Sequence, residues 1–214
     1  INTMNVRSFI FMCMANSPSY EKFLKTCDFS DTFMWHKRFL QALETQEKPE
    51  KWLLKDPSHI SHTPELVSTY PGAKFIHIHR NPVKSIGSLS SLTMSVRSGL
   101  SNHADPHEIG AAVLDFWQYA IEKSISDRSE HLTSEQIIDI DYRDFIKNPL
   151  EQIKQIYQHF NFELSQSTLD QMQVYIDNQS KEGHEPHHYA LEDFGLDEDM
   201  VQEAFSNYNR IHNF

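Results

Sequence analysis

An arginine and a serine eight positions apart have the chemistry to bind a phosphate dianion. The segment KFIHIHRNPVKSIGSLSSL predicts a strand over residues 74–79, and Arg80 follows at its carboxyl end. Asn81–Pro82 then predicts a helix start, which places Ser88 two turns into that helix. Ligands of open α/β sheets bind beyond the carboxyl ends of the strands, where a guanidinium and a hydroxyl suit a phosphate. The alternative is an arginine that caps the sheet edge or pairs with an acid.

Four segments in order resemble one enzyme family, the sulfotransferases that use 3′-phosphoadenosine 5′-phosphosulfate (PAPS). HRNPVKSIGSLSSL resembles the 3′-phosphate motif, in which Arg is followed by Asn or Asp, then Pro, with a Ser eight residues after the Arg. KWLLKDPSHI resembles a Lys-x-Pro-x-His strand end of the broad bacterial-type group. IIDIDYRDFIKNPLEQIKQIYQHFNF resembles the family's strand, Tyr-Glu-Asp-like turn and helix, and GHEPHHYALEDFGL resembles its His-x-Tyr-Ser-Leu-Glu-Asp-Phe-Gly-Leu segment. Together these matches cover about Lys51 to Phe214.

The resemblance implies transfer of a sulfuryl group from PAPS to a hydroxyl or amine. A small-molecule, carbohydrate or lipid acceptor is expected, although the sequence does not specify the acceptor and leaves phenols and peptides open too. No metal is required. Such a transfer needs in-line geometry, a base for the acceptor proton and a cation near the leaving phosphate. Lys55 is the candidate cation and His59, whose side-chain type titrates near neutrality, is the candidate base. The alternatives are hydrogen bonding by His59 at a helix start, and a catalytic Glu elsewhere.

The resemblance also implies donor contacts from residues later in the chain. Tyr142 matches the tyrosine of the Tyr-Glu-Asp turn and is expected to contact the adenosine, although Arg143 replaces the usual acid. The alternative is a core aromatic at a strand end. In the predicted polar loop over residues 180–188, Lys181, His188 and the following Tyr189 are expected to approach the 3′-phosphate. Three histidines in this loop suggest a metal, but they lack a regular ligand spacing, so no metal is expected.

The predicted elements alternate between strands and helices. Strands are expected at 51–55, 74–79 and 136–140, and helices at 19–25, 31–46, 63–70, 82–97, 106–126, 149–160, 168–178 and 199–210. This order is typical of an α/β domain with a parallel sheet flanked by helices. With the resemblance, it predicts a helix-rich, incomplete sulfotransferase fold of the P-loop-NTPase type.

The glycines do not provide the loop that such a fold uses around the 5′-phosphosulfate. The chain has 6 glycines, no two closer than eleven positions, and neither G-x-x-x-x-G-K-S/T nor G-x-G-x-x-G occurs. The family's loop would precede these residues, and the chain begins with Ile1. We therefore expect a single domain over residues 1–214 that lacks its N-terminal strand and loop, binds PAPS weakly by itself and transfers no sulfate.

Composition excludes several classes. A net charge of −11 argues against wholesale binding of nucleic acid, and two cysteines are no disulfide framework. The sequence contains no apolar run long enough to be a membrane segment.

The compartment and the oligomeric state stay open. The cytoplasm fits a bacterial-type enzyme, whereas an N-terminal signal or anchor would place the protein elsewhere. The alternative functions are a P-loop-type kinase and a non-catalytic nucleotide-binding homologue.

Overall fold

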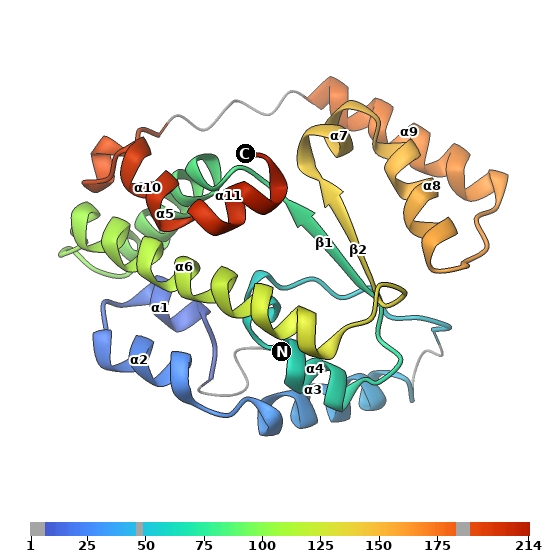
Figure 1. The fold of residues 1–214 in the computed structure, drawn as a ribbon, viewed down its shortest axis with the longest axis horizontal. Helices are drawn as coiled ribbons and strands as arrows, with labels where there is room; N and C mark the ends of the chain where they lie inside the picture. The colour runs from blue at the N-terminus through green and yellow to red at the C-terminus, as the bar shows by residue number, and fades with distance from the viewer. Residues whose placement is uncertain (1–6, 46–48, 183–188) are drawn as a thin grey trace. The chain divides into compact units, whose positions relative to one another are not determined.

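The computed structural model describes residues 7–45, 49–182 and 189–214, and the chain forms two compact units (Figure 1). The helical unit comprises Ile1–Ala73, Pro82–His131 and Ala190–Phe214. The sheet unit comprises Lys74–Asn81 and Leu132–Tyr189. None of the described helices combines the length and the apolarity that crossing a lipid bilayer demands.

The long helix α6 (Pro106–His131) is the centre of the helical unit. Its buried residues recur every three or four positions, so they form one apolar stripe: Ile109, Val113, Phe116, Trp117 and Ala120. The Oδ1 atom of Asp105 accepts the backbone N–H groups of His107 at 2.8 Å and Glu108 at 3.3 Å, which caps the start of the helix.

Helices from three parts of the sequence pack around α6. They include α4 (Thr63–Thr69), α5 (Pro82–Ser98), the 3₁₀ turns η2 (Pro57–Ser61) and η3 (Glu192–Phe194), and the C-terminal α10 (Glu198–Ala204) and α11 (Ser206–His212). Figure 1 shows α5, α10 and α11 on one side of α6, with α4 on the other. At the contact with η3, Gly110 of α6 lies so close to Phe194 that a Cβ at this position would be 2.2 Å from the Phe194 carbonyl oxygen.

The N-terminal helices α1 (Ile10–Met14), α2 (Pro18–Thr26) and α3 (Ser30–Leu43) complete the helical unit. Arg97 of α5 donates from Nη2 to the carbonyl of Met12 at 2.8 Å, which joins α5 to α1. Tyr119 of α6 donates to the carbonyl of Lys25 at 2.6 Å, which joins α6 to α2.

The sheet unit is built on two parallel strands, β1 (Phe75–His79) and β2 (Ile137–Asp141). Residues of β1 face residues of β2 in register, from Phe75 opposite Ile137 to His79 opposite Asp141. The chain then forms α7 (Tyr142–Lys147), α8 (Pro149–His159) and α9 (Gln166–Glu182). Helix α8 packs on β2 and on α9, as Figure 1 shows.

Parallel pairing of two predicted strands with helices around them confirms the predicted α/β class. The strand predicted over Lys51–Lys55 is wrong, because this segment has no regular structure and its residues are exposed, Leu53 at 89%. A strand needs a neighbouring backbone for its ladder, and no described strand borders this segment. A short apolar run of strand length therefore gave a false strand.

Several helices also differ from the predictions. Helix α9 extends to Glu182, so residues 180–182 are helical rather than part of a loop. The predicted final helix is two helices, α10 and α11, with Phe205 between them. Helix α7 was not predicted, although the Asp141 side chain caps it.

Candidate functional site

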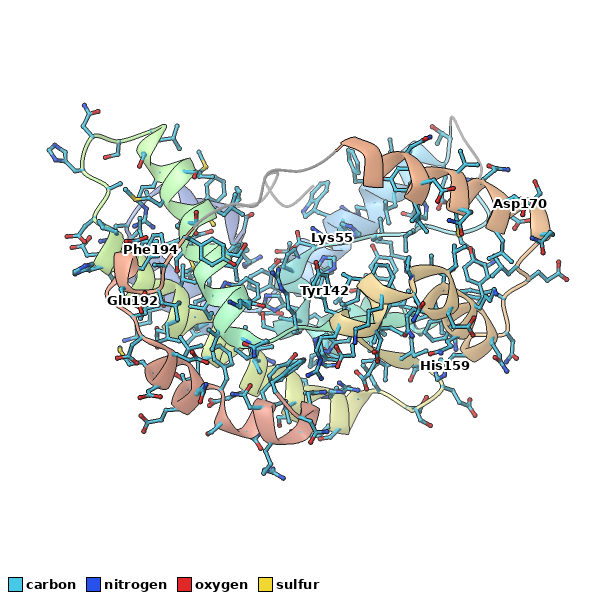
Figure 2. The ribbon with its side chains drawn as sticks, turned by 90° about the horizontal axis from the view of Figure 1, so that it is seen from above. Lys55, Tyr142, His159, Asp170, Glu192 and Phe194 are labelled. Carbon is cyan, nitrogen blue, oxygen red and sulfur yellow. The ribbon has the colours of Figure 1, made fainter. Side chains whose placement is uncertain are left out.

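Arg80 and Tyr142, both predicted to contact the donor, lie together in the sheet unit. Each follows the last residue of a strand, and these last residues, His79 and Asp141, face each other in the sheet. The guanidinium carbon of Arg80 lies 4.9 Å from the centre of the Tyr142 ring. Figure 2 shows Tyr142 at the start of α7. Stacking on a ring orients a guanidinium while leaving its N–H groups available for an anion.

The turn that holds Tyr142 is stabilised by an acid and a base two residues apart. The Asp141 Oδ1 atom accepts the backbone N–H of Arg143 at 2.7 Å, and Arg143 Nε donates to both carboxylate oxygens at 3.0 Å. Hydrogen bonds from the Arg143 side chain lower the pKa of Asp141. Arg143, which stands where the resembled motif has an acid, therefore neutralises the cap of α7.

The alternative role for Arg80, an ion pair with an acid, has no support within the described part of the chain. Arg80 is exposed, and among the described residues it has no hydrogen bond and no ion pair. A cation with no acidic partner at the end of a strand keeps its capacity to bind an anion.

Ser88 is half-buried on α5, on the same flank as Lys84 and Ser85. It belongs to the helical unit, whereas Arg80 belongs to the sheet unit. Joint binding of one phosphate by Arg80 and Ser88 therefore stays a prediction.

The three predicted donor contacts at the end of α9 and after it are described only in part. Lys181 lies in the last turn of α9, so the structure places its backbone in a helix. Tyr189 is half-buried. His188 and the loop histidines His184 and His187 lie outside the described residues, and the roles proposed for this segment stay predictions.

In the helical unit, the two predicted catalytic residues lie just before and within a capped 3₁₀ turn. Lys55 is exposed in the segment before η2 (Figure 2). The Asp56 Oδ1 atom accepts from the Ser58 backbone N–H at 2.8 Å and from the Ser58 hydroxyl at 2.6 Å, which fixes the start of η2. His59 lies in this turn. Lys55, which was predicted at a strand end, precedes the turn in a segment without regular structure.

Aromatic rings surround the His59 imidazole. Its ring centre lies 5.7 Å from that of Phe33 and 6.3 Å from that of His36, both in edge-to-face contacts. Burial lowers the pKa of His59, and the nearby Asp56 carboxylate partly offsets this effect. The imidazole is therefore neutral at neutral pH, which is the protonation state that a general base needs.

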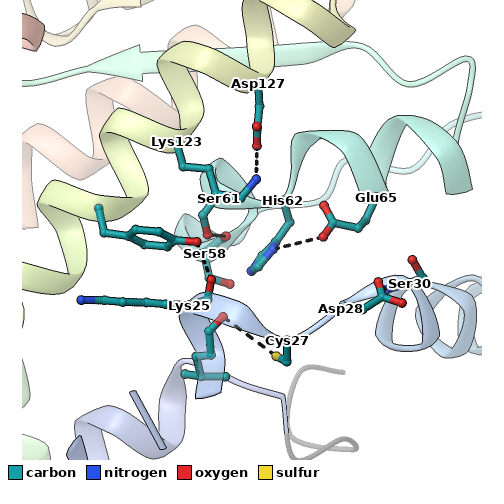
Figure 3. Close-up of polar contacts among 12 residues, drawn as sticks. Lys25, Cys27, Asp28, Ser30, Ser58, Ser61, His62, Glu65, Lys123 and Asp127 are labelled. Carbon is teal, nitrogen blue, oxygen red and sulfur yellow. Dashed lines mark hydrogen bonds and ion pairs between the residues drawn. The ribbon is translucent and has the colours of Figure 1, made fainter. Parts of the chain in front are cut away.

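Two further histidines and a tyrosine join this cluster, and the sequence analysis gave them no role. His36 Nδ1 is hydrogen bonded to the Tyr70 hydroxyl at 2.6 Å, and burial raises the pKa of Tyr70 to about 12. The His62 ring stacks on Phe29 with 3.7 Å between ring centres, and its Nδ1 lies 4.0 Å from the Glu65 carboxylate (Figure 3). His36 shares the apolar face of its helix with Phe33, and this periodicity could have identified it as buried.

The strongest pKa shift in this cluster is that of His62. Burial lowers its pKa to about 3, and the positive charge of Lys123 adds to the effect. Figure 3 shows Lys123 of α6 near His62, with its ammonium group paired to Asp127. Potential metal ligands gather elsewhere, on the face of the sheet that carries His77, His79 and Asp139.

Two parallel strands with helices around them define a helix-rich α/β protein. Residues 1–166 match the sulfotransferase family, so the chain belongs to this family. The match begins before Lys51, so it includes the N-terminal helices, for which the sequence analysis found no family motif.

Solved sulfotransferases have the same fold. The chain is similar to the crystal structure of sulfotransferase STF9 from Mycobacterium avium, with a TM-score of 0.87 and 25% identity over 96% of this chain and 53% of that one. It is also similar to the crystal structure of sulfotransferase STF1 from Mycobacterium tuberculosis H37Rv, with a TM-score of 0.80 and 32% identity over 94% of this chain and 52% of that one. The chain thus spans about half the length of these structures. No curated protein matches it.

Proposed function

We propose that this chain carries the 3′-phosphate side of a donor site for PAPS, in a protein that transfers the sulfuryl group to a hydroxyl or amine acceptor. The family supports sulfotransfer. The identity of the donor is inferred from the chemistry of Arg80 and Tyr142. A guanidinium binds a phosphate through paired charged hydrogen bonds, and an aromatic ring beside it suits a purine nucleotide.

One observation supports this proposal most directly. The Arg80 guanidinium is stacked on Tyr142, exposed, and without a hydrogen-bonding or acidic partner among the described residues. The Tyr142 ring restricts the conformations of the Arg80 side chain, and no described acid neutralises its charge. Binding of an anion therefore costs little further side-chain conformational entropy.

For the transfer step, we assign His59 as the base that takes the proton of the acceptor group. We assign Lys55 as the cation that stabilises the negative charge on the leaving group. The acceptor oxygen or nitrogen forms the new bond to sulfur as the bond between sulfur and the bridging phosphate oxygen breaks. His59 takes the acceptor proton, and the electron pair leaves with adenosine 3′,5′-bisphosphate, whose developing charge an ammonium group stabilises. Because its pKa is lowered, His59 is neutral and can accept a proton. Lys55 is exposed, so its side chain is accessible to the donor.

The test is binding of adenosine 3′,5′-bisphosphate without metal, measured by saturation-transfer NMR, which detects weak ligands. We expect Arg80→Ala to weaken this binding about tenfold, the effect of losing charged hydrogen bonds worth about 1.5 kcal/mol. Binding of adenosine 5′-phosphate, which has no 3′-phosphate, should change little.

Arg38 offers a matched control, because its guanidinium carbon lies 5.0 Å from the centre of the Trp35 ring in the helical unit. Arg38→Ala removes a comparable arginine–aromatic contact and should leave bisphosphate binding unchanged. The role assigned to Arg80 would be contradicted if the two variants lost equal affinity for the bisphosphate. It would also be contradicted if Arg80→Ala lost equal affinity for the bisphosphate and for adenosine 5′-phosphate. Stronger binding of ADP with Mg²⁺ than of the bisphosphate would favour the kinase alternative instead.

A further inference from the structure

Two histidines and an aspartate project from one face of the small sheet. His77 and His79 are two residues apart on β1, and alternate residues of a strand point to the same face. Asp139 of β2 faces His77 directly in the parallel register. Three side chains that can bind a metal are therefore brought together by backbone pairing between segments about sixty residues apart in sequence.

The donor atoms of these residues lie close together. His79 Nε2 is 2.7 Å from Asp139 Oδ1, and the ring centres of His77 and His79 are 4.0 Å apart. One potential ligand atom from each residue lies within 4.8 Å of the others. His79 is buried, His77 is half-buried, and the Asp139 side chain is 44% exposed, so the carboxylate side of the group is open to solvent.

We propose that His77, His79 and Asp139 form a binding site for a divalent transition-metal ion such as Zn²⁺. Two imidazole nitrogens and one carboxylate oxygen are a donor set that Zn²⁺ accepts while it keeps a fourth position for water or another ligand. Co²⁺ and Ni²⁺ accept the same donors, whereas Mg²⁺ and Ca²⁺ prefer sites made of oxygen atoms.

Metal binding requires only small side-chain movements. Bonds of about 2.0–2.2 Å at tetrahedral angles place ligand atoms roughly 3.3 Å apart. The His79–Asp139 separation must therefore lengthen and the widest separation must shorten, each by rotation of side chains. Asp139, as the most exposed of the three, has the room to rotate, while the β1–β2 ladder holds all three backbones in place.

A second acid on this face is already neutralised. Asp141 faces His79 in the register, but its carboxylate accepts from Arg143 Nε and from the Arg143 backbone N–H. Asp139 is therefore the carboxylate that we assign to the metal. A purely structural His79–Asp139 hydrogen bond is the rival interpretation, and it predicts no metal affinity.

The experiment is titration of the chelator-treated chain with Zn²⁺ by isothermal calorimetry, and with Co²⁺ by visible absorption. We expect one ion per chain and an absorption band typical of four-coordinate Co²⁺. Asp139→Asn keeps the shape and a hydrogen-bond acceptor for His79 but removes the charge. This variant and His77→Ala should each weaken Zn²⁺ binding by about tenfold or more.

The matched control removes the loop histidines outside the described residues, in the variant His184→Ala, His187→Ala, His188→Ala. This variant should bind Zn²⁺ as tightly as the unaltered chain. The proposal is overturned if no stoichiometric binding occurs, if Asp139→Asn and His77→Ala bind Zn²⁺ unchanged, or if the loop variant loses the ion. Circular dichroism of each variant verifies that it is folded. Because the readout is metal binding, failure here would leave the proposed donor site untouched.

Discussion

His62 lies between the ring of Phe29, the Glu65 carboxylate and the ammonium group of Lys123, and it belongs to a cluster of three histidines whose pKa values are all lowered. In each case burial is the largest cause, because a charged imidazole loses its hydration in the helical unit. The folded chain therefore holds these side chains neutral, while the unfolded chain protonates them near the ordinary imidazole pKa.

This difference predicts that acid destabilises the helical unit. The pKa of His62 falls from 6.5 to about 3 on folding, so its contribution is fully present above pH 6.5 and is lost as the pH falls toward 3. At pH 5, the loss from His62 is about 2 kcal/mol of unfolding free energy. Urea unfolding at pH 7 and pH 5 should show a smaller difference between the two pH values in His62→Gln than in the unaltered chain.

His103 provides the control for this prediction, because it is exposed in the segment between α5 and α6. His103→Gln should keep the full pH dependence. If His62→Gln and the unaltered chain lose equal stability between pH 7 and pH 5, His62 is protonated in the folded state and the prediction is wrong.

At the level of residues, Arg80 was predicted from its place after a strand, and Tyr142 from the resemblance to the Tyr-Glu-Asp turn. The two lie together because strands in a parallel pair end at the same edge, which neither prediction used. The sequence could not predict the histidine cluster in the same way. His36, His59, His62 and Tyr70 meet only when α3, η2 and α4 pack together. No spacing in a single helix or strand specifies such a contact.

At the level of elements, the contact between α6 and η3 depends on the absence of a side chain at Gly110. A Cβ at Gly110 would lie 2.2 Å from the Phe194 carbonyl oxygen and 2.9 Å from the Phe194 Cβ. Phe194 is itself buried and ends the 3₁₀ turn η3, which is followed by Gly195, whose φ of 66° favours glycine. Moving either α6 or η3 away from this contact would therefore cost stability.

Gly110→Ala should therefore lower stability by about 3 kcal/mol, even though alanine favours a helix more than glycine does. The measurement is the melting temperature and the urea midpoint. Gly72→Ala is the matched control, since no atom lies within 4 Å of a Cβ built there, and it should change stability by less than about 1 kcal/mol. A Gly110→Ala protein as stable as the control would show that η3 shifts without cost.

Local signals predicted most elements but gave a false strand at Lys51–Lys55. Asn81–Pro82 and Asp105–Pro106 marked the starts of α5 and α6, because caps and prolines act over a few residues. Lys51–Lys55 has a strand-like composition but no neighbouring backbone among the described strands. Strands depend on distant partners, so composition alone did not decide this segment.

At the level of the whole molecule, the two units differ in how much core they hold. Most buried apolar side chains belong to the helical unit, among them Phe33, Ile86, Ile109 and Val201. The described part of the sheet unit has only Ile140 and Phe160 in that class. Since burial of apolar surface is the main source of stability, the sheet unit is expected to open more readily.

Hydrogen exchange followed by mass spectrometry checks this expectation. Peptides from α6 should exchange at least about tenfold more slowly than peptides from α8, because opening of the sheet unit does not require the core around α6 to open. Equal protection of the two helices would mean that both units unfold in one cooperative step.

The order of the chain through the two units has a consequence for synthesis on the ribosome. β1 is made early, but its partner β2 follows only after α5 and α6, and about sixty residues at 5–20 residues per second take roughly 3 to 12 s. During this interval Ile76 and Ile78 of the nascent strand have no β2 backbone with which to pair. The packing of α5 on α6 shortens the flexible span between the strands, and the synthesis of β2 sets the earliest time at which they can pair.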